Sequence, residues 1–510
     1  MKTTVSQKQL WILIAGFALF NIFMHLAVVN NFEYHRDELL YFSLGNHLAF
    51  GYASVPPMIA WIARIMQTLF GTSVFAVKLF PALLSGVYVG LVLLITKELG
   101  GKVYALILAG VATMVTIFNL RSFHLFQPVH LELVLWAIIA YVSILYVNTK
   151  KDNYLIILGI VCGLALLNKY LVSLWIVGLL LAIITSEDRI IFTKKSFYIG
   201  LGLGLLIFLP NIIWQVVNDF PVLRHINELS ERQLVNVNRL EFLTDQLLMP
   251  FAASMLVVPG LIFLMISKKY RYLGIASLFV ILVLWLLKGK SYYTLGIFSV
   301  LLAGGAVWIG NNVKALWLKI LLPVLLVGLT LKMLPLGLPI YKTDKMVAYF
   351  QKLEEDTGMT LGRQFEDGTI HSLPQDYADQ LGWKRIAELA IEAFQQAENP
   401  SQTMIYCENY GQAGAVSLIG KKHGLPEAVS FSDAYRYWVP KKFDEEIEHL
   451  IYINDNLGED VEALFDEVKE VGRLENIHAR EYGTRIYLLS KPNRPVSEFW
   501  DEVLERVFEE

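Results

Sequence analysis

Two neighbouring carboxylates, Asp37 and Glu38, follow an apolar stretch at residues 10–29. A stretch of about twenty apolar residues is long enough to cross the hydrocarbon core of a bilayer. A carboxylate at the end of such a segment can accept a proton from a hydroxyl group presented at the membrane surface. We therefore predict that Asp37 is a general base. Glu38 is predicted to share the catalytic site, where it orients a substrate or holds the base.

Cationic and phenolic side chains occur at the ends of other apolar stretches, on the side of the membrane where Asp37 is expected. Charge-assisted donors of this kind can bind the phosphate group of a lipid. The alternative is that lysines at helix ends extend to the interface regardless of function. The predicted substrate-binding residues of this type are Arg36, Arg121, Lys169, Tyr170, Lys288, Lys290, Tyr292 and Tyr293.

Glu132 lies inside a further apolar stretch, with His130 two residues before it. A carboxylate within the membrane costs about 2.5–3.5 kcal/mol, so it usually faces a cavity or a partner. We predict that His130 and Glu132 also contact the substrate. The alternative is a structural pair between Glu132 and Arg121 or a histidine.

The sequence does not specify a cofactor. His25, His35 and His47 lie near Asp37 and Glu38 along the chain, but their separations match no metal-ligand pattern. Binding of a divalent cation is an alternative, but we do not expect it.

Apolar composition indicates a polytopic α-helical membrane protein. Hydrophobic residues make up 55% of the chain and charged residues 17%, which excludes an ordinary soluble protein. We predict about eleven transmembrane helices, at residues 10–29, 74–96, 103–119, 129–147, 153–168, 170–185, 196–216, 247–267, 272–287, 293–310 and 315–334.

The first outer loop, residues 31–73, has apolar residues at helical spacing on both sides of Val55-Pro-Pro57. This pattern predicts two amphipathic helices that lie in the membrane interface, separated by a rigid turn. Asp37 and Glu38 would stand in the first turn of the first of these helices.

Lysine and arginine predict the orientation, because short cytoplasmic loops carry an excess of both. A cytoplasmic N-terminus places the basic clusters at residues 97–102, 150–151, 189–195, 268–271 and 314–319 on the same side. The loop of Asp37 and the chain after about residue 335 would then face outward from the cytoplasmic membrane.

Charge divides the chain into two predicted domains, a membrane body at residues 1–335 and an extracytoplasmic domain at residues 340–510. The second holds 33 of the 46 acidic residues and 18 of the 43 basic ones, so a nucleic-acid partner is not expected. It reads as a small α/β domain, with strands at 403–407, 449–454 and 485–489 and helices at 383–397 and 459–471.

Several motifs together resemble those of the bacterial membrane glycosyltransferases of the GT-C superfamily, of the family 39 type, which includes relatives of protein O-mannosyltransferases and the lipid A aminoarabinose transferase. The matching segments are Tyr34–Phe42 with Pro56-Pro57, Phe126–Trp136, Gly163–Tyr170, Lys288–Tyr293, Gln375–Trp383 and Asn409–Ala415. Two positions depart from the family pattern. Ser54-Val55 precedes the proline pair in place of an acid or histidine, and Asn168 stands where serine is usual.

The resemblance implies a sugar donor on a polyprenyl phosphate and transfer to an acceptor hydroxyl of a lipid, glycan or protein outside the cytoplasmic membrane. Asp37 matches the acid that such enzymes carry in the first outer loop. An inverting reaction would use Asp37 as base and the cations on the departing phosphate. The alternatives are a lipid or sugar transporter or flippase, and a membrane scaffold whose acidic domain binds partners.

Overall fold

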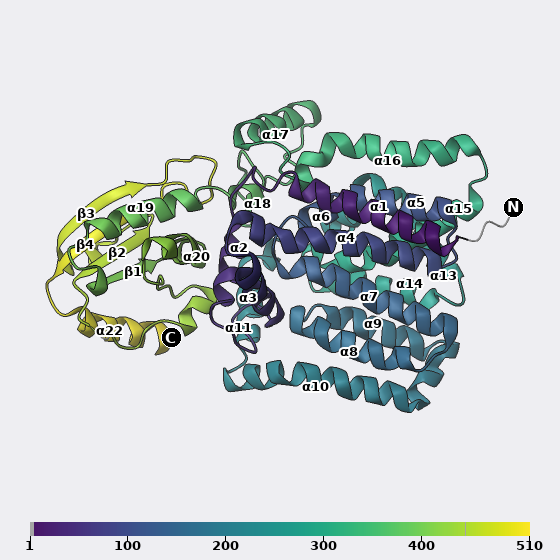
Figure 1. The fold of residues 1–510 in the computed structure, drawn as a ribbon, viewed down its shortest axis with the longest axis horizontal. Helices are drawn as coiled ribbons and strands as arrows, with labels where there is room; N and C mark the ends of the chain where they lie inside the picture. Colours follow the sequence, from purple (N-terminus) through teal and green to yellow (C-terminus); the bar gives the residue numbers. More distant parts are fainter. Residues whose placement is uncertain (1–4, 444, 510) are drawn as a thin grey trace. The chain divides into compact units, whose positions relative to one another are not determined.

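The structure is a computed structural model that describes residues 5–443 and 445–509. It contains two compact units (Figure 1). Unit 1 comprises Met1–Val29, Ala49–Ile59 and Lys78–Tyr341, and unit 2 comprises Asn30–Leu48, Ala60–Val77 and Lys342–Glu510. Most of the first outer loop therefore packs with the C-terminal residues, although sequence alone grouped it with residues 1–335.

Unit 1 consists of helices. They are α1 (Gln7–Leu26), α4 (Val74–Glu98, whose first turn belongs to unit 2), α5 (Val103–Val115), α6 (Ile117–Ser122), α7 (Pro128–Thr149), α8 (Asn153–Asn168), α9 (Val172–Ile184), α10 (Lys195–Val217), α11 (Pro221–Arg232), α12 (Arg239–Leu248), α13 (Ser254–Ile266), α14 (Arg271–Leu286), α15 (Phe298–Asn312) and α16 (Leu316–Gly337). Short 3-10 helices join some of them, namely η1 (Glu187–Thr193), η2 (Leu234–Asn236), η3 (Phe251–Ala253) and η4 (Ser291–Ile297).

All eleven predicted apolar stretches form helix, but the count of eleven membrane spans is not confirmed. Six helical segments of the described chain are long and apolar enough to span, or seven if the bent pair Arg239–Leu248 and Phe251–Ile266 is one span. The segments α5, α8, α9 and α14 have 13–16 residues. At 1.5 Å per residue they are shorter than a hydrocarbon core of about 30 Å.

Glycines allow α8 and α10 to pack closely. A Cβ built on Gly200 would overlap the carbonyl oxygen of Leu155, and one on Gly163 would lie 2.9 Å from Cα of Gly204. Small residues at such a contact let two helix backbones approach. Gly200 and Gly204 therefore serve the packing of α10 on α8.

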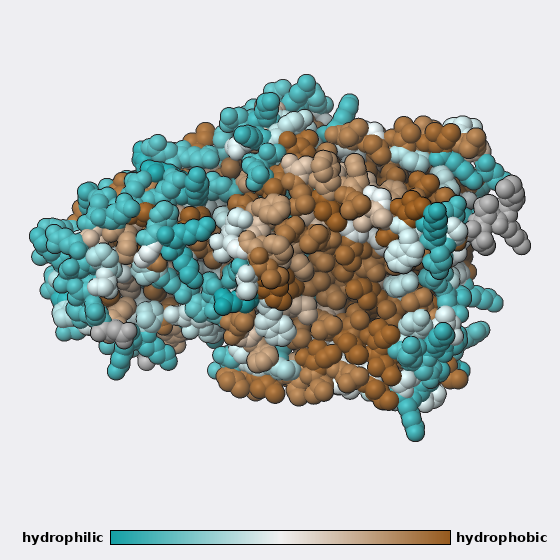
Figure 2. Space-filling view, viewed as in Figure 1, coloured by the Kyte–Doolittle hydropathy of each residue, from teal (hydrophilic) through white to brown (hydrophobic). Residues whose placement is uncertain are grey.

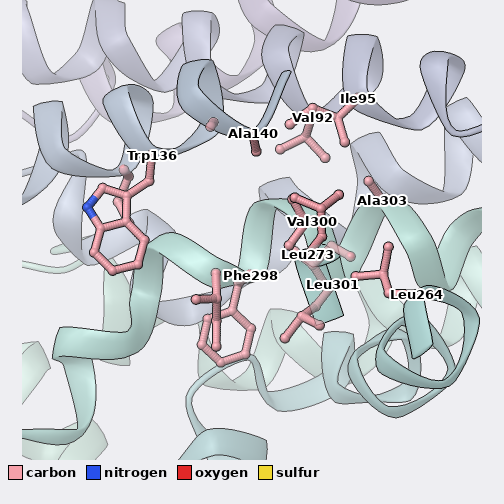
Figure 3. Packing of buried hydrophobic residues seen from close by; sticks show 14 of the residues in the cluster. Val92, Ile95, Trp136, Ala140, Leu264, Leu273, Phe298, Val300, Leu301 and Ala303 are labelled. Carbon is pink, nitrogen blue, oxygen red and sulfur yellow. The ribbon is translucent and has the colours of Figure 1, made fainter. Parts of the chain in front are cut away.

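The core of unit 1 contains buried side chains from α4, α7, α13, α14 and α15 (Figure 3). Trp136 and Trp175 are fully buried and their rings stack at 5.6 Å. Hydrophobic residues also cover much of the visible outer surface of unit 1, whereas hydrophilic residues predominate on the surface of unit 2 (Figure 2). Exposed leucine, isoleucine and phenylalanine on α1, α10 and α16 suit contact with lipid.

Unit 2 contains a four-stranded sheet in the order β1-β2-β4-β3. The parallel pair is β1 (Thr403–Cys407) with β2 (His449–Asn454), and β4 (Arg485–Pro492) runs antiparallel to β2 and to β3 (Phe465–Arg473). The remaining elements are α2 (Arg36–Leu44), α3 (Met58–Phe70), α17 (Thr343–Thr357), α18 (Gln375–Ala378), α19 (Trp383–Gln396), η5 (Pro400–Gln402), α20 (Tyr410–Ile419), η6 (Gly420–His423), η7 (Asp433–Tyr437), α21 (Glu459–Glu462) and α22 (Val496–Glu509).

Alternating side chains give the sheet two apolar faces. Met404, Leu450, Tyr487 and Leu489 pack on one face with α22, whose Phe499 and Trp500 belong to the same cluster. Helix α19 contacts β2, β3 and β4, and α20 contacts β1 (Figure 1). The predicted strands at 403–407, 449–454 and 485–489 and the helix at 383–397 are confirmed.

The predicted helix at 459–471 is wrong. Only Glu459–Glu462 is helical, and Phe465–Arg473 forms the edge strand β3. Its side chains are mostly exposed and charged, as is common at a sheet edge, where charge discourages pairing with another chain. Apolar spacing at Val461, Leu464 and Val468 suggested a helix, but pairing with β4 decides the conformation.

The predicted helices of the first outer loop are present as α2 and α3, separated at Val55-Pro-Pro57. Helix α3 has an apolar exposed side, with Ile65 and Leu69 56% and 66% exposed. Helix α2 is not amphipathic in the expected sense, because Glu38–Leu44 are all buried. Its outer side is covered by α20, a packing that no local sequence pattern reveals.

Candidate active site

The first turn of α2 positions Asp37. His35 stands at the helix N-cap, where Glu38 Oε2 accepts a hydrogen bond of 2.7 Å from the His35 backbone N–H. This reciprocal capping satisfies donors that a helix start otherwise leaves unpaired. Glu38 has no exposed surface, whereas the Asp37 side chain is 29% exposed. Asp37 is therefore the carboxylate of this pair that a substrate can reach.

Tyr410, at the start of α20, contacts Asp37 directly. Its hydroxyl donates a hydrogen bond of 2.9 Å to Asp37 Oδ1. The guanidinium of Arg36 lies over the Tyr410 ring, 4.4 Å from its centroid, a cation–π arrangement. Burial and the negative charge of Asp37 raise the pKa of Tyr410 well above its ordinary value. Tyr410 is therefore a neutral donor that orients the carboxylate.

His35 lies among three aspartates. Its Nδ1 is 4.0 Å from Asp37 Oδ2, and its Nε2 is 3.8 Å from both Asp376 Oδ1 and Asp379 Oδ2. Burial alone would lower the pKa of His35, but Asp376, Asp37 and Asp379 together raise it to about 9. Arg480 Nη1 donates to both oxygens of Asp379 at 3.3 Å. This charged cluster holds the start of α2.

The two contacts of the His35 ring differ in the protonation state that they need. Nδ1 lies 3.1 Å from the Asp37 backbone N–H and can accept from it only in a neutral ring. The three carboxylates instead favour the imidazolium. Because the raised pKa lies above neutrality, we assign the imidazolium at neutral pH, with the Asp37 amide contact weakened.

Backbone pairing fixes the segment before α2 against the chain near α18. The Arg36 N–H donates to the Asp379 carbonyl at 3.0 Å, and the Glu33 N–H donates to the Gln380 carbonyl at 3.1 Å. Glu33 Oε2 in turn accepts from the Lys384 N–H at 2.9 Å. These bonds bring Asp376 and Asp379 to His35.

Helix α20 is placed by its cap and its glycines. Asn409 Oδ1 accepts from the Gly411 and Gln412 N–H groups at 2.9 and 3.1 Å, as expected for an N-cap after strand β1. A Cβ on Gly411 would lie 2.8 Å from Arg36 Cγ, and one on Gly414 would lie 2.7 Å from Leu39 Cβ. Larger residues at these positions would move Tyr410 away from Asp37.

Four of the predicted substrate-binding residues come together in unit 1. Lys169 Nζ donates to Glu132 Oε2 at 2.9 Å and lies 5.6 and 5.1 Å from the ring centroids of Tyr292 and Tyr293. The partner of Glu132 is thus Lys169, and the alternative pairing with Arg121 or a histidine is wrong. Glu132 Oε1 is buried and has no hydrogen-bond partner among the described residues.

Tyr170 and His130 each form hydrogen bonds within unit 1, and His130 also packs against aromatic rings. The Tyr170 hydroxyl donates to Asn211 Oδ1 at 2.9 Å, and Asn211 Nδ2 donates to the Phe50 carbonyl at 2.7 Å. His130 is fully buried, its Nδ1 accepts from the Gln127 N–H at 3.2 Å, and its ring packs against Phe80 and Phe126.

The other predicted cations of unit 1 have contacts of their own. Arg121 ends α6 with its guanidinium 6.0 Å from the Phe118 ring centroid. Lys288 follows α14 with φ of 55°, and its Nζ lies 3.5 Å from the Val235 carbonyl. Lys290 caps η4 through its backbone. Arg36, Asp37 and Glu38 belong to unit 2, and the others belong to unit 1.

Within residues 5–443 and 445–509, no group of three or more histidine, cysteine, aspartate or glutamate side chains has a geometry that could hold a metal ion. The cluster around His35 instead contains two arginines and an imidazole, whose cationic groups balance its carboxylates.

Comparison with known proteins decides the class of this fold. The family model described as dolichyl-phosphate-mannose-protein mannosyltransferase matches residues 54–214. The crystal structures of ArnT from Cupriavidus metallidurans, apo and bound to undecaprenyl phosphate, superpose with TM-scores of 0.64 and 0.62, at 14% and 15% identity, over 95% of this chain and 98% of theirs. The chain therefore shares the fold of ArnT.

Among curated proteins, the lipid A galacturonosyltransferase RgtD of Rhizobium johnstonii is 27% identical over 276 residues, which are 51% of this chain and 54% of RgtD. The match thus spans about half the length of that relative. The apolar helices of unit 1 and the fold shared with ArnT are those of a multi-pass membrane protein.

Sequence reasoning selected Asp37 but missed Tyr410, Asp376, Asp379 and Arg480. The first three lie in the segments 375–383 and 409–415, which carried part of the family resemblance, and that was the available signal. Arg480 stands in a polar loop before β4 with no motif around it.

Proposed function

We propose that this chain is an inverting glycosyltransferase, which moves a sugar from a polyprenyl-phosphate donor to an acceptor hydroxyl at the outer face of the cytoplasmic membrane. The observation that carries the proposal is the hydrogen bond from Tyr410 to Asp37 Oδ1, which orients a partly exposed carboxylate in a chain with the fold of ArnT. The undecaprenyl phosphate bound to ArnT supports the class of donor. The match to RgtD supports an acceptor like lipid A.

Asp37 acts as the general base. It accepts the proton of the acceptor hydroxyl while that oxygen attacks the anomeric carbon of the sugar. The bond between the anomeric carbon and the phosphate oxygen breaks, and its electron pair leaves with the polyprenyl phosphate. Attack on the face opposite the leaving group inverts the configuration at the anomeric carbon.

Cations stabilise the departing phosphate, which develops negative charge as the bond breaks. We assign this role to Lys169, with contributions from Arg36, Arg121, Lys288 and Lys290. Lys169 is held by Glu132 and by the rings of Tyr292 and Tyr293, so its ammonium is positioned before a ligand arrives. The proposed carboxylate base comes from unit 2, and most of the proposed cations come from unit 1.

We assign the binding of the sugar and the shape of the site to Glu132, His130 and Tyr170. Glu132 Oε1 is a buried acceptor without a partner among the described side chains, and a sugar hydroxyl is a suitable donor for it. Glu38 caps α2 and thereby holds the base.

The test is transfer by the purified chain in proteoliposomes, with radiolabelled polyprenyl-phosphate sugars and a lipid A acceptor. We expect label on the acceptor and one released polyprenyl phosphate for each sugar transferred. Movement of intact donor across the bilayer, without cleavage of the sugar–phosphate bond, would instead identify a flippase and contradict the proposal.

A further inference from the structure

A cationic cavity of about 280 Å³ lies within unit 2, and none of the residues described around Asp37 lines it. It is lined by one arginine, two lysines, four neutral polar residues and a leucine: Asn46, Arg64, Gln67, Thr68, Thr72, Leu418, Lys421 and Lys422. No carboxylate lines it. This is unexpected in unit 2, whose C-terminal residues 342–510 hold 33 acidic and 18 basic residues.

The three cations come from distant parts of the chain. Arg64 lies on α3, and Lys421 and Lys422 form the middle of η6, directly after α20. None of the three forms an ion pair with a carboxylate in the part of the chain that the structure describes. Their charge is therefore available to an anion, and several cations around one small cavity favour phosphate.

Neighbouring groups hold the wall of the cavity in place. Gln67 Nε2 donates to the Phe42 carbonyl at the end of α2, and Thr68 Oγ1 donates to the Arg64 carbonyl at 2.8 Å. A Cβ on Gly45 would lie 3.0 Å from the Arg64 backbone nitrogen. The close approach of α3 to the chain at Phe42 and Gly45 thus preforms this side of the cavity.

Helix α3 carries an apolar stripe beside the cavity. Ala63 and Met66 are buried, Arg64, Gln67 and Thr68 face the cavity, and Ile65 and Leu69 are exposed. On a helix, Ile65 and Leu69 lie on one line, next to the line of Arg64 and Thr68. An apolar stripe beside cationic residues is the pattern of a helix that rests in a membrane interface.

We propose that this cavity binds the phosphate group of an anionic membrane lipid, with the acyl chains of that lipid along Ile65 and Leu69. Lys421, Lys422 and Arg64 neutralise the phosphate, and Asn46, Thr68 and Thr72 offer hydrogen bonds to its oxygens or to its headgroup. The site is separate from the assigned cations of the leaving phosphate and adds an anchoring or acceptor-binding function to the proposed transferase.

Lipid retention by the full-length purified protein tests this inference. The protein is equilibrated with mixed micelles of dioleoyl phosphatidic acid and dioleoyl phosphatidylcholine, and native mass spectrometry measures the bound lipids. We expect preferential retention of phosphatidic acid. Lys421→Gln combined with Lys422→Gln should lower it about tenfold, since each lysine near an anionic headgroup contributes substantially to binding.

The chain offers a matched control in Lys441 and Lys442, a second pair of consecutive exposed lysines outside the cavity. Lys441→Gln with Lys442→Gln should leave retention unchanged, and Ile65→Ser with Leu69→Ser should lower it. Equal loss in both lysine pairs, or no loss in the Lys421 and Lys422 pair, would overturn the inference. Displacement of the lipid by equimolar glycerol 3-phosphate would also overturn it and indicate a site for soluble phosphate.

Because the readout is binding, it is independent of transfer. A chain that retains phosphatidic acid but moves no sugar would contradict the proposed function alone. A chain that transfers sugar but shows no preference for phosphatidic acid would contradict this inference alone.

Discussion

At the scale of residues, Asp37 depends on groups that are far away in the sequence. Tyr410, 373 positions later, donates to its carboxylate, and Asp376 and Asp379 surround the neighbouring His35. The phenol stays protonated because burial and Asp37 raise its pKa. We therefore propose that Tyr410 positions Asp37. A variant that lacks the Tyr410 hydroxyl tests the orientation of Asp37 while Asp37 itself stays in place.

Tyr410→Phe keeps the ring under Arg36 and removes the donor. A hydrogen bond to a charged group contributes about 1.5–3 kcal/mol, so we expect kcat for transfer to fall by about 10- to 100-fold. Thermal unfolding of the purified variant in detergent serves as the control for folding. Unchanged kcat in a folded variant would show that Tyr410 does not orient the base.

His35→Asn tests the charge of the imidazole, because asparagine can still cap α2. The raised pKa means that the His35 charge stabilises the fold fully below pH 6.5 and that this contribution is lost as pH rises through about 9. Asp37, Asp376 and Asp379 face the ring. We expect the Tm of the wild-type chain to fall more than that of His35→Asn between these pH values. Parallel curves would mean that His35 is not charged.

Sequence alone identified Asp37, since an acid after an apolar segment needs a chemical reason. It could not identify Tyr410, because that contact exists only once α20 packs on α2 through Gly411 and Gly414. The pair of Glu132 and Lys169 was predicted as two site residues but not as an ion pair, since the contact depends on how the ends of α7 and α8 meet.

At the scale of elements, helix packing in unit 1 rests on small residues. Helices α8 and α10 approach so closely at Gly159, Gly163, Gly200 and Gly204 that backbone faces backbone. Lipid provides little drive for association of apolar helices, so this contact matters for the stability of the membrane unit.

Gly200→Ala and Gly202→Ala form a matched pair on α10. A Cβ at position 200 would overlap the Leu155 carbonyl, whereas one at position 202 has nothing within 4 Å. Overpacking typically costs about 1–3 kcal/mol, so Gly200→Ala should lower the Tm of the protein in detergent. Gly202→Ala should leave the Tm unchanged or raise it. Equal Tm values for the two variants would argue against close packing of α8 on α10.

Each of the eleven apolar stretches that periodicity predicted forms helix in unit 1. A helix that contacts lipid needs such a stretch. Apolar periodicity gave the wrong result where packing against a neighbouring element decides the structure. Phe465–Arg473 is a strand because β4 is beside it, and Glu38–Leu44 are buried because α20 covers them. Apolar periodicity also did not give the number of membrane spans, because several of the apolar helices are shorter than the length needed to cross a bilayer.

At the scale of the whole molecule, three separate stretches of chain build unit 2. Asp37, the proposed base, therefore lies in the same unit as the C-terminal sheet. We propose that this unit faces outward from the cytoplasmic membrane. The distribution of lysine and arginine in the short loops supports this orientation.

Cysteine labelling tests the orientation. Glu475→Cys introduces a thiol at a side chain that is 79% exposed in unit 2, while Cys407 is buried and Cys162 is half-buried in the apolar helix α8. A membrane-impermeant maleimide should label Glu475→Cys in intact spheroplasts and Lys314→Cys only after permeabilisation. The reverse pattern would place unit 2 in the cytoplasm.

The most direct measurement of the central claim is the single-turnover rate of sugar transfer by Asp37→Asn in proteoliposomes, beside its affinity for undecaprenyl phosphate. Asparagine keeps the shape of the side chain and cannot take the proton. We expect transfer to fall at least about a hundredfold, the lower range for loss of a general base, with affinity for undecaprenyl phosphate and Tm unchanged. Transfer at the wild-type rate by this variant would contradict the assignment of Asp37 as the base.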